Sequence, residues 1–94
     1  MSIRFVWDQQ KARSNQAKHG ISFDEAASVF RDSLALIFDD VRHSDEEIRE
    51  IVIGHSNRNR LLLVSFTERS ESIRIISARK TTGREQSQYE QSHP

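Results

Sequence analysis

The stretch LLLVSFTERSESIRIISAR, residues 61–79, decides the fold of this chain of 94 residues. It contains two apolar runs, residues 61–67 and 72–79, that are rich in Leu, Val and Ile. The polar link between the runs has the length of a β-hairpin turn, and such runs are typical of paired strands. The stretch therefore predicts an antiparallel hairpin inside a sheet.

The second run carries more positive charge than a buried strand needs. Strict alternation of side chains places Ile73, Ile75 and Arg79 on one face and Arg74 on the other, so neither face is purely apolar. We therefore expect a central strand whose charged end, at Arg79, either holds an anion or pairs with surface acids.

The segments around this hairpin complete the pattern of elements. The first and last predicted helices begin at Asp8 and near Thr82, and Thr82 forms a capping box with Glu85. The predicted fold class is α+β, with two N-terminal helices and a C-terminal helix on a mostly antiparallel sheet of four to five strands. We expect a single domain over residues 1–94. Further strands are predicted at 3–7, 34–38 and 50–54, and further helical residues at 9–19 and 22–30.

Two of the predicted helices offer little apolar surface. On the first helix, Lys11, Asn15 and His19 form a polar stripe, which we expect to face solvent rather than a partner. On the C-terminal helix, Tyr89 is the large apolar group, so this helix is expected to dock loosely or to be stabilised by a partner.

The charges balance overall but are divided along the chain. Lys and Arg number 14, as do Asp and Glu. Residues 1–48 hold six basic and nine acidic residues, whereas residues 49–94 hold eight basic and five acidic ones. This asymmetry predicts one surface for an anion and another for a basic partner, unless the folded chain mixes the charges in space.

Composition also excludes several classes of protein. The chain has no cysteine, so disulfide frameworks and thiolate chemistry are ruled out. No apolar stretch approaches the ~20 residues of a membrane-spanning helix, and the N-terminus does not resemble a signal peptide. A cytoplasmic protein without membrane association is expected.

A candidate anion site lies where the charged strand ends. Arg79, Lys80 and the helix N-terminus near Thr82 combine a planar guanidinium, an ammonium and free backbone N–H groups, a set that suits a phosphate. Pairing of these cations with surface acids is the alternative. In an up-down-up meander, Arg49 and Arg79 should lie at opposite ends of the sheet.

The histidines do not have the spacing of a metal site. The four histidines are far apart in the sequence, so we predict no metal and no cofactor. His43 and His55 fall in turns, where each is either a general acid or base or simply solvated.

Three stretches together resemble a known family: FVWDQQKARSNQAKHGISFDEAASVF (5–30), HSDEEIREIVIG (43–54) and RIISARKTTGREQSQYE (74–90). In this order they are similar to the BrnT toxins of bacterial type II toxin–antitoxin systems. The resemblance implies a RelE-like fold and a metal-independent endoribonuclease that inhibits translation. It also implies a BrnA-like antitoxin with a ribbon-helix-helix region, through which both proteins bind operator DNA and repress their operon.

The resemblance implies four candidate site residues, Arg79, Arg49, Glu47 and Arg69. A ribonuclease mechanism assigns roles to these and to further charged residues. Arg79 would stabilise the phosphorane, and Glu47 or Glu68 would accept the proton of the RNA 2′-hydroxyl, with Tyr89 or His55 as weaker candidates. The catalytic candidates are Arg79, Arg49, Arg69, Glu47 and Glu68, and the RNA-binding candidates are Lys80, Arg84, Arg74 and Tyr89. The alternative function is an interaction module that only binds the antitoxin and tunes repression.

Overall fold

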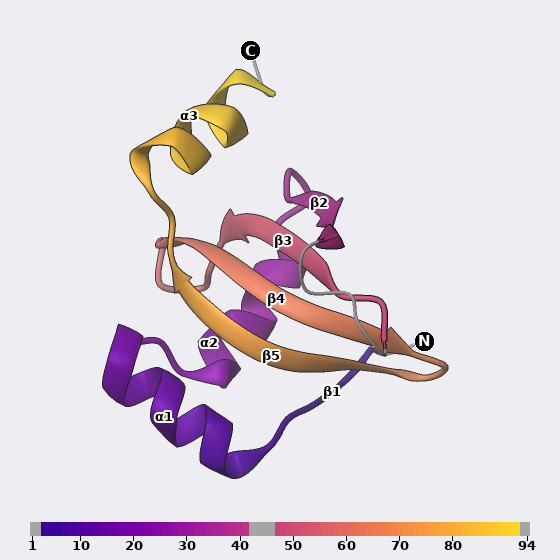
Figure 1. Cartoon of the computed structure of the whole chain (residues 1–94). Helices are drawn as coiled ribbons and strands as arrows, with labels where there is room; N and C mark the ends of the chain where they lie inside the picture. Colours follow the sequence, from indigo (N-terminus) through magenta and orange to yellow (C-terminus); the bar gives the residue numbers. More distant parts are fainter. Residues whose placement is uncertain (1–2, 42–46, 93–94) are drawn as a thin grey trace.

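The computed structural model describes residues 3–41 and 47–92. Its elements follow the predicted order (Figure 1): β1 (Arg4–Val6), α1 (Gln9–His19), α2 (Phe23–Ser28), the 3-10 turn η1 (Val29–Arg31), β2 (Leu36–Asp39), β3 (Glu50–His55), β4 (Leu61–Arg69), β5 (Ser72–Lys80) and α3 (Gly83–Gln91).

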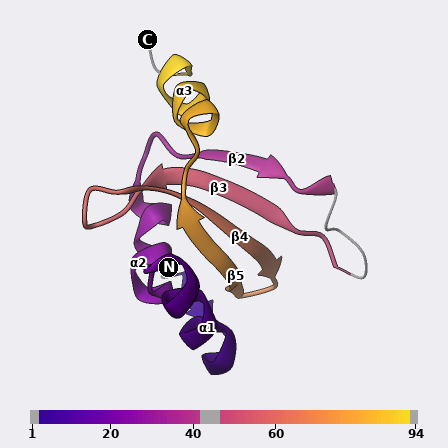
Figure 2. The ribbon, with the colours of Figure 1, turned by 60° about the vertical axis from the view of Figure 1, so that its left-hand side comes forward.

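The strands form a five-stranded sheet in the order β1-β5-β4-β3-β2. β1 pairs with β5 in parallel, and the other neighbours are antiparallel. α1 and α2 pack on one face, here called the helix face, and α3 lies over a corner of the opposite, open face (Figures 1 and 2). The predicted α+β fold is confirmed. The charged strand β5 is interior, as expected, although β4 occupies the middle position.

Each face of the sheet has its own apolar cluster. The larger cluster lies under α2, where Phe23 and Ala26 meet Val52, Val64 and Ile75, all nearly inaccessible to water. The smaller cluster lies on the open face, where Tyr89 of α3 packs with two strand residues, Ile53 and Leu63. Burial of apolar surface is the main favourable term in folding, so Tyr89 anchors α3 to the open face.

A β-bulge in β5 overturns the predicted alternation of side chains. Ser77 pairs with Ser65 but Ile75 pairs with Phe66, so Ile76 is the extra residue on the bulged strand. Ile75 and Ala78 both enter the cluster on the helix face, which strict alternation does not allow. The expectation that Arg74 and Arg79 lie on opposite faces is therefore wrong, because the bulge puts both on the open face.

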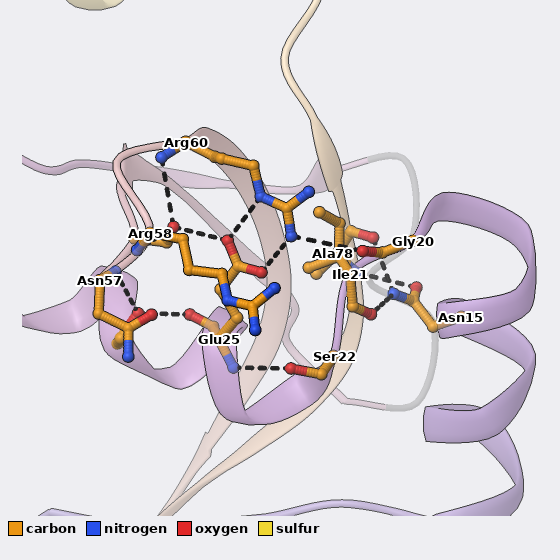
Figure 3. A network of polar contacts seen from close by, with 11 residues as sticks. Asn15, Gly20, Ile21, Ser22, Glu25, Asn57, Arg58, Arg60 and Ala78 are labelled. Carbon is orange, nitrogen blue, oxygen red and sulfur yellow. Dashed lines mark hydrogen bonds and ion pairs between the residues drawn. The ribbon is translucent and has the colours of Figure 1, made fainter.

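α1 is held to the sheet by a buried amide rather than by an apolar stripe (Figure 3). Asn15 Nδ2 donates to the carbonyls of Ile21 and Ala78 at 3.0 and 2.9 Å, and Asn15 Oδ1 accepts from the Ala78 N–H at 3.0 Å. The Asn15 side chain thus takes the place of a neighbouring strand beside β5, beyond the short pairing with β1. The prediction that Asn15 faces solvent is wrong.

A buried ion pair attaches α2 to the turn between β3 and β4 (Figure 3). The carboxylate of Glu25, which is 5% exposed, accepts two hydrogen bonds from Arg60 and one of 2.6 Å from the Ser56 hydroxyl. Ser22 caps α2 by accepting from the Glu25 N–H at 3.1 Å. The hydrogen bonds of Arg60, outweighing the effect of burial, hold the pKa of Glu25 below its ordinary value.

Asn15→Ala should lower the free energy of unfolding by about 2–4 kcal/mol, because it leaves the buried N–H and carbonyl of Ala78 without partners. Urea denaturation measures the change. Gln16→Ala, an exposed position on the same helix, is the matched control and should stay within about 0.5 kcal/mol of wild type. Equal stability of the two variants would contradict the role of Asn15.

Glu25→Gln should destabilise the protein most at neutral pH. A carboxyl whose pKa is lowered by folding contributes stability above the pKa of the unfolded chain and loses that contribution as the pH falls. The stability gap between wild type and the variant should therefore narrow below about pH 4.5. Denaturation at several pH values tests this, with Asp24→Asn at an exposed neighbouring position as control; a gap that stays constant down to pH 3 would be the contrary result.

Candidate functional site

The predicted site residues fall at two ends of the sheet. β3 and β5 are both antiparallel to β4, so they run parallel, and Arg49 and Arg79 lie at opposite ends as expected. Between the pairs Arg69–Ser72 and Leu63–Arg79 the sheet extends for about 20 Å. A single catalytic centre therefore cannot contain both groups.

The far end, where β4 turns into β5, holds most of the catalytic candidates. Arg69 pairs with Glu47, with 3.0 Å between Nη2 and Oε2, and both side chains are largely exposed. The strand register places Arg69 and Arg74 on the open face, and Arg49, one residue before β3, continues that face. Glu68 pairs with Ile73 and so points to the helix face.

At the far end of the sheet, the alternation of side chains along the strands places arginines on one face and carboxylates on the other. Arg4 of β1 pairs with Ser72 and joins the other arginines on the open face. Glu50 and Asp39 pair with each other on the helix face, near Glu68. Burial, together with the charges of Glu68 and Asp39, raises the pKa of Glu50. Charges are thus grouped by face at this end of the sheet, but the grouping does not follow the two halves of the sequence, because Arg4 comes from the acidic half and Glu50 and Glu68 come from the basic half.

At the other end of the sheet, Arg79 is clamped by the capping box of α3. Its Nη1 and Nη2 donate to the two carboxylate oxygens of Glu85 at 2.8 and 2.9 Å, and Nη1 also donates to the Lys80 carbonyl. Glu85 accepts from the Thr82 N–H at 2.9 Å, which confirms the predicted box. The hydrogen bonds from Arg79, stronger than the effect of burial, lower the pKa of Glu85.

The pairing positions Arg79 without using all of its donors. A guanidinium has five N–H groups, and the bonds to Glu85 and Lys80 use three of them. In the described part of the chain, the Nε–H and one N–H of Nη2 are left for an anion. The expected pairing with an acid and the expected anion site are therefore compatible.

A polar triad of Asp32, His55 and Tyr89 lies at the same end of the sheet as Arg79. The sequence did not reveal these three residues as a unit. The Tyr89 hydroxyl donates to Asp32 Oδ2 at 2.7 Å, and His55 Nδ1 lies 3.3 Å from the same hydroxyl. The backbone N–H of His55 also donates to Asp32 Oδ2, at 2.8 Å. Asp32, His55 and Tyr89 line a surface depression of about 620 Å³.

The environment of the triad fixes its protonation. Burial raises the pKa of Tyr89 to about 12, and its bond to Asp32 acts in the same direction, so the phenol stays protonated at neutral pH. Burial alone would raise the pKa of Asp32, but the backbone N–H groups of His55 and Leu34 donate to its carboxylate and lower it. The side chain of His55 is 46% exposed, so a bound molecule can reach it.

α3 brings the triad and Arg79 to one site. His55 pairs with Leu61 and Arg79 with Leu63, so their Cα atoms lie about 12 Å apart across β4. α3 starts beside Arg79 and places Tyr89 against His55, with the two rings 5.2 Å apart. Tyr89 is therefore well buried against the open face. It is the only buried residue of α3, so loose docking or stabilisation by a partner stays a prediction. Lys80 and Arg84 are exposed at the edge of this site, and Lys80 points to the helix face.

Two features are absent from the part of the chain that the structure describes. Over residues 3–41 and 47–92, no group of three or more His, Asp or Glu side chains could hold a metal ion. In the same ranges, none of the helices has the length and apolar character needed to span a bilayer. His43 and His93 lie outside the described residues.

The fold, with three helices on a five-stranded mixed sheet, is similar to that of a small ribonuclease toxin. The structure of the Brucella abortus ribonuclease toxin, BrnT, superposes with a TM-score of 0.66 and 24% sequence identity, over 86% of this chain and 99% of that one. This likeness concerns the fold. No match was found among the curated proteins.

The family of this chain is identified from its sequence. Residues 7–85 match the family described as "Ribonuclease toxin, BrnT, of type II toxin-antitoxin system". This chain therefore belongs to the BrnT family of type II toxins, as the motifs quoted above indicated.

Tyr89 is the only tyrosine of the chain, so its ionisation can be followed directly by ultraviolet absorbance. Wild type should titrate near pH 12, well above the ordinary value of 10. Asp32→Asn removes the negative charge that opposes ionisation, so its titration should begin at lower pH. A wild-type midpoint near 10, unchanged in the variant, would show that the Tyr89–Asp32 bond does not form.

Proposed function

We propose that this chain is an endoribonuclease that cleaves RNA without a metal ion and acts in the cytoplasm as the toxin of a type II module. The observation that carries the proposal is the grouping of His55, Tyr89 and Asp32 with Arg79 at the α3 end of the open face. A base, a hydroxyl and a fixed cation are the groups that a metal-free cleavage of RNA needs.

In the proposed reaction, the 2′-hydroxyl of one ribose attacks the adjacent phosphorus atom. His55 accepts the proton of that hydroxyl while the bond between phosphorus and the 5′-oxygen breaks, and the 5′-oxygen takes a proton from water. The products are a 2′,3′-cyclic phosphate and a 5′-hydroxyl end. The remaining N–H groups of Arg79 neutralise the charge on the phosphorane oxygens, and Glu85 keeps the guanidinium in position.

His55 replaces the acids that the sequence favoured as the base. Glu47 is bound to Arg69 at the far end, and Glu68 points to the helix face, whereas Arg79 and His55 share the open face. Asp32 supports His55 by accepting its backbone N–H and by orienting the Tyr89 hydroxyl toward Nδ1.

The arginines of the far end are proposed to bind the RNA backbone. Arg4, Arg49, Arg69 and Arg74 share the open face with the proposed catalytic centre. Contacts with phosphates dominate the affinity of proteins for nucleic acids, and a chain of zero net charge can provide them only by local separation of charge. Lys80 and Arg84 add positive charge at the edge of the centre.

The family supports further parts of the proposal. Type II toxins are paired with a protein antitoxin, and we propose a BrnA-like antitoxin with a ribbon-helix-helix region. The complex would repress its own operon through that region, and the free toxin would stop growth by inhibiting translation.

The bidentate bond between Arg79 and Glu85 favours one alternative, since it gives Arg79 a structural role. In that case the chain would only bind the antitoxin and tune repression. The absence of any cleavage activity in the free wild-type protein would favour this alternative.

His55→Ala and Arg79→Ala should each lower the rate of RNA cleavage by about 100-fold or more, because they remove the base and the phosphate ligand. Cleavage of a labelled RNA, with and without EDTA, measures the effect, and EDTA should leave the wild-type rate unchanged. Arg13→Ala, an exposed position on α1, is the control and should cleave like wild type. Full activity of His55→Ala would refute the assignment, and inhibition by EDTA would refute the metal-free reaction.

A further inference from the structure

The outer side of β2 is an open edge of the sheet. β2 pairs with β3 through the registers Leu36–Ile53 and Phe38–Ile51, and in the described part of the chain no strand pairs with its other side. Figure 2 shows β2 as the outermost strand, away from α1 and α2. Open edges carry unpaired N–H and C=O groups that can pair with another chain.

The hydrogen-bond pattern identifies the residues that face outward. The Asp40 N–H donates to the Arg49 carbonyl at 2.8 Å. In an antiparallel pair, every second residue bonds the same neighbour, so Leu36 and Phe38 also turn their backbone groups toward β3. Ile37 and Asp39 therefore present their N–H and C=O groups to the open edge.

β2 is short and ends at the charged Asp39, but three features that often keep an edge strand unpaired are absent from it. β2 reads LIFD, without a lysine, a proline or a bulge. The side chain of Ile37 is 57% exposed on the helix face. By contrast, Asn15 bonds both backbone groups of Ala78 and so covers the side of β5 beyond its pairing with β1.

The surroundings of the edge are acidic. Ile37 shares the helix face with Asp39 and Glu50, and Glu68 approaches Glu50 closely enough to affect its ionisation. Neighbouring carboxylates repel one another, and a cation from a partner would relieve this repulsion. The edge is thus complementary to an extended segment that carries basic and apolar side chains on its inward face.

We propose that the antitoxin neutralises this chain by adding a strand to the outer edge of β2. Its backbone pairs with Ile37 and Asp39, an apolar side chain covers Ile37, and a basic side chain meets Asp39 and Glu50. The inference rests on the proposed function, because it assumes a protein antitoxin. β2 begins four residues after Asp32, so the added strand would lie beside the depression of the triad.

Amide hydrogen exchange followed by NMR tests strand addition directly. The probe is the protein encoded next to this gene, added to the isotopically labelled toxin. The Ile37 and Asp39 amides should exchange at least about tenfold more slowly in the complex, whereas the Leu36 and Phe38 amides should be protected before and after. A complex in which the Ile37 and Asp39 amides still exchange freely would overturn the inference. Concentration-dependent protection in the free toxin would overturn it too, since a second copy would then occupy the edge.

A matched pair of variants separates this inference from the proposed function. Ile37→Lys with Asp39→Lys should still arrest growth but should bind the antitoxin about 100-fold more weakly, so that co-expression no longer rescues the cells. Ile3→Lys, an exposed position on the opposite edge, should be rescued like wild type. Full rescue of the double variant would overturn the inference, whereas failure of the antitoxin to bind wild type would refute the proposed pairing itself.

Discussion

One extra residue, Ile76, determines which way the arginines of β5 point. Without this bulge, either Arg74 or Arg79 would lie under the helices, beside the apolar cluster of Val64 and Ile75. A guanidinium buried there without a partner would be very unfavourable. With the bulge, Ile73, Ile75 and Ala78 fill the core while both arginines reach the open face. The proposed RNA surface and the contact of Arg79 with α3 both depend on this local change of register.

Polar contacts compensate for a modest apolar core. α1 has almost no apolar stripe, and the amide of Asn15 attaches it by completing the hydrogen bonds of Ala78. The pair of Glu25 and Arg60 attaches α2 to the turn that follows His55. Both contacts lie near the end of the sheet that carries the triad. In a small domain, these polar contacts fix the position of the backbone that carries the proposed catalytic groups.

Much of the fold could be predicted because it depends on short-range patterns. The hairpin of β4 and β5, the caps at Asp8 and Thr82, and the separation of Arg49 from Arg79 followed from periodicity and topology. The bulge could not be predicted, since Ile76 is an ordinary strand residue and no glycine marks the position. The role of Asn15 also depends on a partner 63 residues away in sequence, which no local pattern reveals.

The candidate site was predictable only where its residues are neighbours in sequence. Arg79, Lys80, Arg84 and Tyr89 come together because they share one strand end and one helix. Asp32 was missed because a single aspartate after a helix is typical of a turn. Its hydrogen-bond partner Tyr89 is 57 positions away in the sequence. His55 was weighed as a weak candidate, and its contacts with Asp32 and Tyr89 are what make it the proposed base.

We propose that RNA binds the open face with its reactive phosphate between His55 and Arg79. NMR titration of the labelled protein with a short RNA carrying 2′-O-methyl groups, which cannot be cleaved, tests it most directly. We predict that the largest shifts occur at His55, Arg79 and Tyr89 and continue through Ser77 to Arg74. Shifts confined to α1 and α2, or to the far end around Glu47 and Arg69, would contradict this account.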